Sequence, residues 1–163
     1  MLGRHQVAIN QPVLDHLRDV AHQRNEYARA HGLQHRAGVN ENDTRRGVMS
    51  EYAYCVWAGI KFRDHEQHHG PPGQDDDING VQIRSTTWAT GHLLTYETDN
   101  PGPYVLVTLN KVHNDLVIAT LRGWQWLDEC NQLKWWRTNC RRPAYWTPQS
   151  ELHPMSTLTV IYN

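Results

Sequence analysis

The fold is organised around residues 74–87, which read Gln74-Asp75-Asp76-Asp77-Ile78-Asn79-Gly80-Val81-Gln82-Ile83-Arg84-Ser85-Thr86-Thr87. Three aspartates stand in a row, an Asn-Gly dipeptide follows, and a short run rich in β-branched residues comes after it. Asn-Gly is a turn signal, and β-branched residues favour strands. The stretch therefore predicts an acidic loop that feeds a β-strand.

The two faces of this strand differ in polarity, because side chains on a strand point alternately to its two sides. The mostly apolar face carries Val81, Ile83 and Ser85. The polar face carries Gln82, Arg84 and Thr86. Neighbouring aspartates repel one another at low dielectric, so the acidic run is costly unless it faces water or a cation. A hard divalent metal ion binds oxygens of this kind.

The spacing of four residues here resembles the active-site hairpin of the PD-(D/E)XK, or restriction-endonuclease-like, nuclease superfamily. It is similar in particular to small phage and bacterial nuclease-like proteins of that superfamily, whose pattern is Asp-x-x-Gly-x-Glu-x-Arg. The matching positions are Asp77, Gly80, Gln82 and Arg84. The sequence departs from the superfamily twice, because Gln82 stands where an acid is usual and Arg84 stands where lysine is usual.

A preceding helix offers the further glutamate that this superfamily often adds. It is Glu51, in the segment Gly47-Val48-Met49-Ser50-Glu51-Tyr52-Ala53. In a helix, this residue falls at the edge of an apolar stripe formed by Val48, Tyr52, Cys55 and Val56. A carboxylate there would reach a site beside the core. The resemblance covers roughly residues 45–124.

The resemblance implies metal-assisted hydrolysis of phosphodiester bonds in DNA. Asp77 and Gln82, with the Ile83 carbonyl, would hold Mg²⁺ or Mn²⁺, and Glu51 would be a further ligand, directly or through water. The metal polarises the phosphate and lowers the pKa of a bound water. A guanidinium stays protonated, so Arg84 would bind the phosphate or stabilise its developing charge rather than act as a base. Because Gln82 removes one negative charge, it should weaken Mg²⁺ binding. The alternative that the site is slow or inactive therefore stays open.

Other interpretations of the same residues stay open. The acidic run is by default a solvated loop, Arg84 a surface cation paired with a neighbour, Gln82 a solvent-facing residue and Glu51 a helix-surface acid. A second function on the same scaffold is a degenerate module that binds nucleic acid or a protein partner without cleavage. A third, a hydrolase using one of the eleven histidines, lacks a Gly-x-Ser-x-Gly or His-Glu-x-x-His stretch.

Length and charge limit the classes of function. Residues 1–163, with a mass of 19.0 kDa, are expected to form one domain. The net charge of -1 gives no overall basic signature, so any contact with DNA needs local basic patches. The sequence has three cysteines without CxxC spacing, no signal-peptide pattern and no apolar run long enough to span a bilayer. We therefore expect the protein in the cytoplasm of a bacterium or of a phage-infected cell.

Helices are expected before the acidic stretch and strands after it. Residues 11–31 have helical periodicity, with proline in the first turn and glycine at the stop. A second helix is predicted from a cap at Asp43 or Thr44 to Ala58. Between them and the acidic stretch, residues 64–73 form a histidine-bearing polar loop, for which zinc binding is the alternative.

The remaining pattern is strand-rich. Residues 92–97 are expected to form a hairpin with the motif strand, and residues 104–109 and 116–121 are apolar enough to be buried strands. Residues 147–152 predict a capped helical turn, and residues 156–162 a last strand. The sequence therefore predicts a four-strand meander preceded by helices, in an α+β or layered α/β fold. With the resemblance, this predicts a restriction-endonuclease-like fold whose central mixed sheet of four to five strands is flanked by helices.

Candidate nucleic-acid contacts fall into two groups. Arg45 and Arg46 lie in the first turn of the second helix and oppose its dipole, so a phosphate or an ion pair with Glu41 or Asp43 would compensate. The densest basic and aromatic segment carries the others, Lys134, Arg137, Arg141 and Arg142. Cations suit phosphates and rings suit exposed bases, although tryptophans also pack in cores. DNA is the expected partner, no membrane partner is expected, and cutting both strands of a duplex would favour a homodimer.

Overall fold

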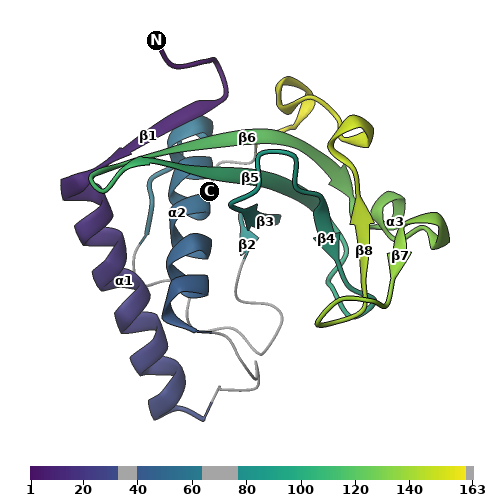
Figure 1. Ribbon diagram of the computed structural model, residues 1–163, viewed down its shortest axis with the longest axis horizontal. Helices are drawn as coiled ribbons and strands as arrows, with labels where there is room; N and C mark the ends of the chain where they lie inside the picture. Colours follow the sequence, from purple (N-terminus) through teal and green to yellow (C-terminus); the bar gives the residue numbers. More distant parts are fainter. Residues whose placement is uncertain (33–39, 64–76, 161–163) are drawn as a thin grey trace.

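Two long helices pack on one face of a five-stranded mixed sheet, and a three-stranded antiparallel sheet lies beyond its other face (Figure 1). The computed structural model describes residues 1–32, 40–63 and 77–160. The expected α+β class, with helices packed on a mixed sheet of four to five strands, is confirmed. The loop predicted at residues 64–73, and Asp75 and Asp76, lie outside the described residues.

The large sheet has the strand order β1-β6-β5-β3-β2. Its strands, in chain order, are β1 (Gln6–Asn10), β2 (Asp77–Ile78), β3 (Val81–Thr86), β5 (Pro103–His113) and β6 (Leu116–Trp126). Strands β3 and β5 run parallel, whereas the other neighbours are antiparallel. The predicted four-strand meander is therefore wrong, because a parallel pair needs a crossover connection. The buried strands expected at 104–109 and 116–121 are confirmed as parts of β5 and β6.

The small sheet contains β4 (Leu93–Thr95), β8 (Ala144–Thr147) and β7 (Trp136–Arg137). The prediction that residues 92–97 pair with the motif strand is wrong, because β4 pairs antiparallel with β8. Leu93 is fully buried in a core cluster that also contains Tyr104 and Leu106 of β5. Burial against the far face of the large sheet therefore outweighs pairing with the nearest strand.

Short helical turns lie before and after strands β7 and β8 in the chain. The expected turn at 147–152 corresponds to η3 (Gln149–Glu151), although Thr147 itself belongs to β8. Where residues 156–162 were predicted to form a strand, the described part instead begins with η4 (Met155–Thr157). Met155 is buried in the main core and anchors this segment by packing rather than by strand pairing. The remaining short helices are α3 (Leu127–Cys130) and η2 (Leu133–Trp135).

The first long helix, α1 (Gln11–Ala30), matches the prediction at 11–31. The second, α2 (Glu41–Ala58), ends at Gly59 as expected, in the left-handed conformation that suits glycine. Its predicted cap is wrong, because Asn40 caps the helix and forms a capping box with Asp43. The two arginines at 45 and 46 therefore lie one turn further from the helix end, where the dipole is weaker.

The main core lies between these two helices and the large sheet. Its buried members include Val48 and Cys55 of α2, as the predicted stripe requires. Val56 is 49% exposed, so its place in that stripe is wrong, and Tyr54 is buried instead. In the part of the chain that the structure describes, no helix is long and apolar enough to cross a membrane.

Candidate functional site

The candidate site begins at the hairpin formed by β2 and β3. Ile78 pairs with Val81 and Asp77 with Gln82, which leaves a two-residue turn at Asn79 and Gly80. Both turn residues have positive φ, 52° and 82°. A two-residue hairpin turn of this type favours Asn-Gly, because its twist matches that of the strands. The turn signal in the sequence is therefore confirmed, and it fixes residue 77 directly opposite residue 82.

Strand β3 presents Gln82 and Arg84 on the sheet face away from the two long helices. Val81 and Ile83 pack with the main core on the helix side. Gln82 and Arg84 alternate with them and are in register with Tyr104 and Leu106 of β5, which face the other way. Gln82 is only 8% exposed, so the alternative that it is a solvent-facing residue is wrong.

Arg84 is held by an acid and two aromatic rings. Its Nη2 lies 2.9 Å from Oδ1 of Asp99, and the side chains of the pair are 30% and 13% exposed. Its Cζ is 5.4 Å from the ring centroid of Tyr104 and 5.8 Å from that of Tyr96. Burial, followed by the charge of Asp99, raises the pKa of Tyr104 to about 12, against the opposing effect of Arg84. Tyr104 is therefore a neutral wall of this site.

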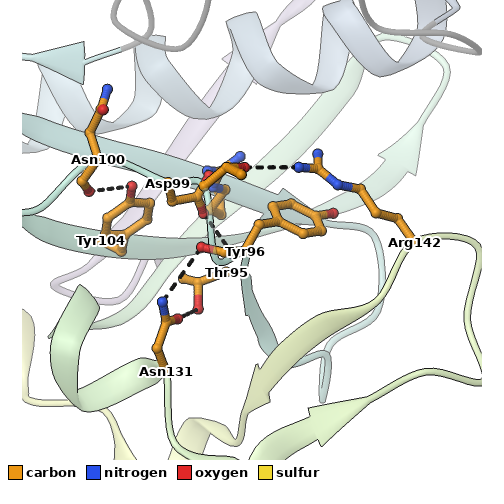
Figure 2. A network of polar contacts seen from close by, with 9 residues as sticks. Thr95, Tyr96, Asp99, Asn100, Tyr104, Asn131 and Arg142 are labelled. Carbon is orange, nitrogen blue, oxygen red and sulfur yellow. Dashed lines mark hydrogen bonds and ion pairs between the residues drawn. The ribbon is translucent and has the colours of Figure 1, made fainter.

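The loop after β4 positions Asp99 (Figure 2). Its Oδ2 accepts a hydrogen bond from the Tyr96 backbone N–H at 2.8 Å, and its own N–H donates to the Tyr96 carbonyl at 3.1 Å. The Tyr104 hydroxyl donates to the Asn100 carbonyl at 2.8 Å and ties the loop to β5. The carboxylate that orients Arg84 is thus fixed at both its side chain and its backbone.

Glu51 lies in a different layer from Arg84. It is on α2, which packs on the helix side of the sheet. Its Oε2 is 2.7 Å from Nη1 of Arg24 on α1, and the two side chains are 10% and 13% exposed. Burial, followed by the charge of Glu51, raises the pKa of the Cys55 thiol to about 12. The structure therefore brings Gln82 and Arg84 together on one strand and places Glu51 in a buried ion pair between the helices.

The donor set at the hairpin can be compared with what Mg²⁺ or Mn²⁺ needs. Mg²⁺ commonly takes one or two carboxylates and completes its shell with water and substrate oxygens. By residue type, Asp77 would supply a carboxylate, and Gln82 and the Ile83 carbonyl would supply neutral oxygens. This set fits the metal in donor type, with a single negative charge. Within residues 1–32, 40–63 and 77–160, no group of three or more His, Cys, Asp or Glu side chains could hold a metal ion.

The predicted nucleic-acid contacts occupy two separate regions. Arg45 and Arg46 are partly buried on α2, and Arg46 forms an ion pair with Asp43, one of the two partners expected for this segment. The other four residues are exposed, in and around the small sheet: Lys134, Arg137, Arg141 and Arg142. Three of them lie over aromatic rings. Arg137 Cζ is 5.1 Å from the Trp146 centroid, Lys134 Nζ is 4.6 Å from that of Trp135 and Arg142 Cζ is 3.8 Å from that of Tyr96.

Sequence reasoning missed the two residues that hold the candidate side chains. Asp99 lies in an Asp-Asn-Pro-Gly stretch, whose composition predicts only a turn. Arg24 is one of several arginines on α1, and nothing in its spacing links it to Glu51, 27 residues away.

Comparison of the chain with protein-family models, with curated proteins and with solved structures gives no match.

Proposed function

We propose that this chain is a metal-dependent nuclease that hydrolyses phosphodiester bonds in DNA at the β2–β3 hairpin. One observation carries the proposal: residue 77 stands opposite Gln82, and Arg84 lies on the same strand face as Gln82, fixed by Asp99. These are the positions that an acid–turn–acid–basic hairpin requires. A restriction-endonuclease-like fold is the matching proposal for the architecture. It is supported by a helix before the hairpin and by the mixed sheet that contains it.

The residues of this chain would divide the chemistry as follows. Asp77 and Gln82 would hold Mg²⁺ or Mn²⁺, which supplies polarisation of the phosphate and a bound water of lowered pKa. Arg84 would donate hydrogen bonds to a phosphate oxygen, because its guanidinium stays charged. Asp99 would keep that guanidinium oriented and so reduce the cost of ordering it when the substrate arrives. Glu51, as a metal ligand, would have to exchange Arg24 for the metal.

The second candidate is a module that binds nucleic acid without cleaving it. Two observations favour it, since Gln82 is neutral and the Glu51 carboxylate is already paired with Arg24. A hairpin with one carboxylate would then bind metal too weakly for catalysis. On this alternative the same basic surface would still hold DNA.

Cleavage of plasmid and single-stranded DNA with Mg²⁺, Mn²⁺ or EDTA tests the proposal. We expect metal-dependent cutting that falls by at least about a hundredfold in Asp77→Ala, because a lost ligand should cost no less than a lost outer-shell partner. Gln82→Glu should tighten Mg²⁺ binding, because it restores a negative charge to the shell. Asp19→Ala, which removes an exposed acid of α1, is the matched control and should cut normally.

The outcomes separate the two candidates. Full activity in folded Asp77→Ala would contradict the site assignment. Absence of cutting by folded wild-type protein under every metal would favour the binding module instead. Unchanged metal affinity in Gln82→Glu would place residue 82 outside the metal shell.

A further inference from the structure

The small sheet has one buried face and one partly exposed face. Strand pairing places Leu93 opposite Thr147 and Thr95 opposite Tyr145, and all four residues are buried. The alternate positions form the other face. There Leu94 pairs with Trp146, both half-buried, and the neighbouring strand adds Arg137 opposite Ala144. Because residues alternate along each strand, arginine and aromatic side chains gather on this second face.

Arginine–aromatic contacts continue from this face towards the hairpin. Arg142 Cζ lies 3.8 Å from the Tyr96 ring centroid, close enough for the guanidinium to stack on the ring. Arg84 Cζ lies 5.8 Å from the centroid of the same ring. Figure 2 shows Arg142 reaching the loop that carries Tyr96 and Asp99. Tyr96 therefore connects the small sheet with the arginine of the candidate active site. We call Arg137, Arg142, Tyr96 and Trp146 the arginine–aromatic platform.

The charges on this platform are not neutralised as the charge of Arg84 is. Arg84 has Asp99 beside it, whereas Arg142 has the neutral Thr98 hydroxyl at 3.2 Å. Within the described parts of the chain, neither Arg137 nor Arg142 forms an ion pair with a carboxylate. Burial and the nearby Arg137 lower the pKa of His92, so this histidine stays neutral near pH 7. Two exposed arginines thus leave a local positive charge on a chain whose net charge is -1.

We propose that the arginine–aromatic platform binds a single strand of DNA and leads it to Arg84. A guanidinium stacked on a ring keeps its outer face for a base and its N–H edge for a phosphate. An unpaired base offers its flat face to such a platform, whereas the bases of a duplex are stacked on one another. The proposal rests on the nuclease proposed above and names its substrate class.

Binding can be measured without cleavage in EDTA, by the fluorescence anisotropy of a labelled oligothymidylate. The salt concentration is varied from about 50 to 200 mM, because affinity that comes from phosphate contacts falls steeply over this range. The double variant Arg137→Ala/Arg142→Ala should bind at least about tenfold more weakly. Its slope of log affinity against log salt should fall by about 1.4, since each contact with a single strand contributes about 0.7. The charge-matched control Arg18→Ala/Arg29→Ala, on exposed positions of α1, should leave both values unchanged.

A second pair of variants tests stacking apart from charge. Tyr96→Phe keeps the ring and should bind as the wild type does. Tyr96→Leu should bind at least about fivefold more weakly with the same salt slope, because the ring that holds the Arg142 guanidinium flat is lost, and with it the stacking of one base on that guanidinium. Thermal melts of every variant show whether the fold is retained.

The results distinguish failure of this proposal from failure of the nuclease. If the protein binds single-stranded DNA through the platform but never cuts it, the platform proposal is supported and the nuclease proposal is refuted. Binding that the double variant does not weaken, or the absence of binding, overturns the platform whether or not the protein cuts. Duplex DNA or single-stranded RNA bound as tightly, with the same dependence on the platform, would overturn the assignment to single-stranded DNA.

Discussion

The ion pair between Arg24 and Glu51 should be a major stabilising contact of the helix layer. The two side chains are 13% and 10% exposed, and the closest N–O distance is 2.7 Å. The superfamily resemblance implies that Glu51, on the helix before the hairpin, is a metal ligand. The structure gives Glu51 a second role, because its carboxylate pairs with Arg24, which is largely buried between α1 and α2. Removing either partner should therefore destabilise the fold even without a metal.

The expected magnitude follows from this burial. Removing one partner of a buried ion pair costs about 3–5 kcal/mol, because the remaining charge loses its opposite charge in a poorly solvated place. The slight exposure of both side chains admits some water, so the lower value of about 3 kcal/mol applies. For a chain of this size about 1 kcal/mol shifts Tm by roughly 2–4 °C, so either single variant should melt roughly 6–12 °C lower.

Urea unfolding followed by tryptophan fluorescence in EDTA measures these free energies. The variants are Glu51→Gln, Arg24→Met and the double variant, which should recover at least about 1.5 kcal/mol relative to the sum of the single losses. Glu26→Gln is the matched control, because it breaks an exposed ion pair with Arg29 on α1 and should cost less than about 1 kcal/mol. If Glu51→Gln is more stable than the wild type, or the coupling is under about 0.5 kcal/mol, the reasoning is refuted.

Two further predictions concern pH and backbone packing. Burial, as the largest cause, raises the pKa values of Cys55 to about 12, Cys130 to about 11 and Tyr104 to about 12, from 9.0, 9.0 and 10.0. The folded state then keeps protons that the unfolded state loses, so the free energy of unfolding should fall as pH rises above 9; a flat alkaline profile in urea melts would contradict this. Gly123→Ala should lower stability by about 2 kcal/mol or more, because φ is 151° and the added Cβ would lie 2.7 Å from Leu152 Cβ; a melt unchanged from the wild type would show that the contact relaxes freely.

Local chemistry explains what could be predicted of the fold. The Asn79–Gly80 turn needs positive φ at two positions, which few other dipeptides allow, so the hairpin was visible in the sequence. Helix α1 was visible because a proline in its first turn precedes a long amphipathic pattern. The stop of α2 at Gly59 follows the same logic. Each of these signals acts within a few residues.

The missed features depend on partners far along the chain. Strand β1 pairs with β6 more than 100 residues away, and only the alternation of Val7 and Ile9 could have indicated it. Strand β4 carries no mark that distinguishes a hairpin partner of β3 from a strand of a second sheet. The same limit applies to the site. The motif predicts that Gln82 and Arg84 share a face, but not that Asp99 and Arg24 supply the opposing charges.

The placement of charge also explains why binding and chemistry should be separable in this chain. Arg84 is paired with Asp99, and Arg24 is paired with Glu51, so each pair is neutral overall. The two arginines therefore add little net attraction for a polyanion at long range, whatever they do at contact. Arg137 and Arg142 have no such compensation among the described residues, so the approach of DNA should depend on them. If both proposals hold, variation in the platform should change mainly the affinity for the DNA strand, whereas variation in the hairpin should change mainly the rate of the proposed bond-breaking step.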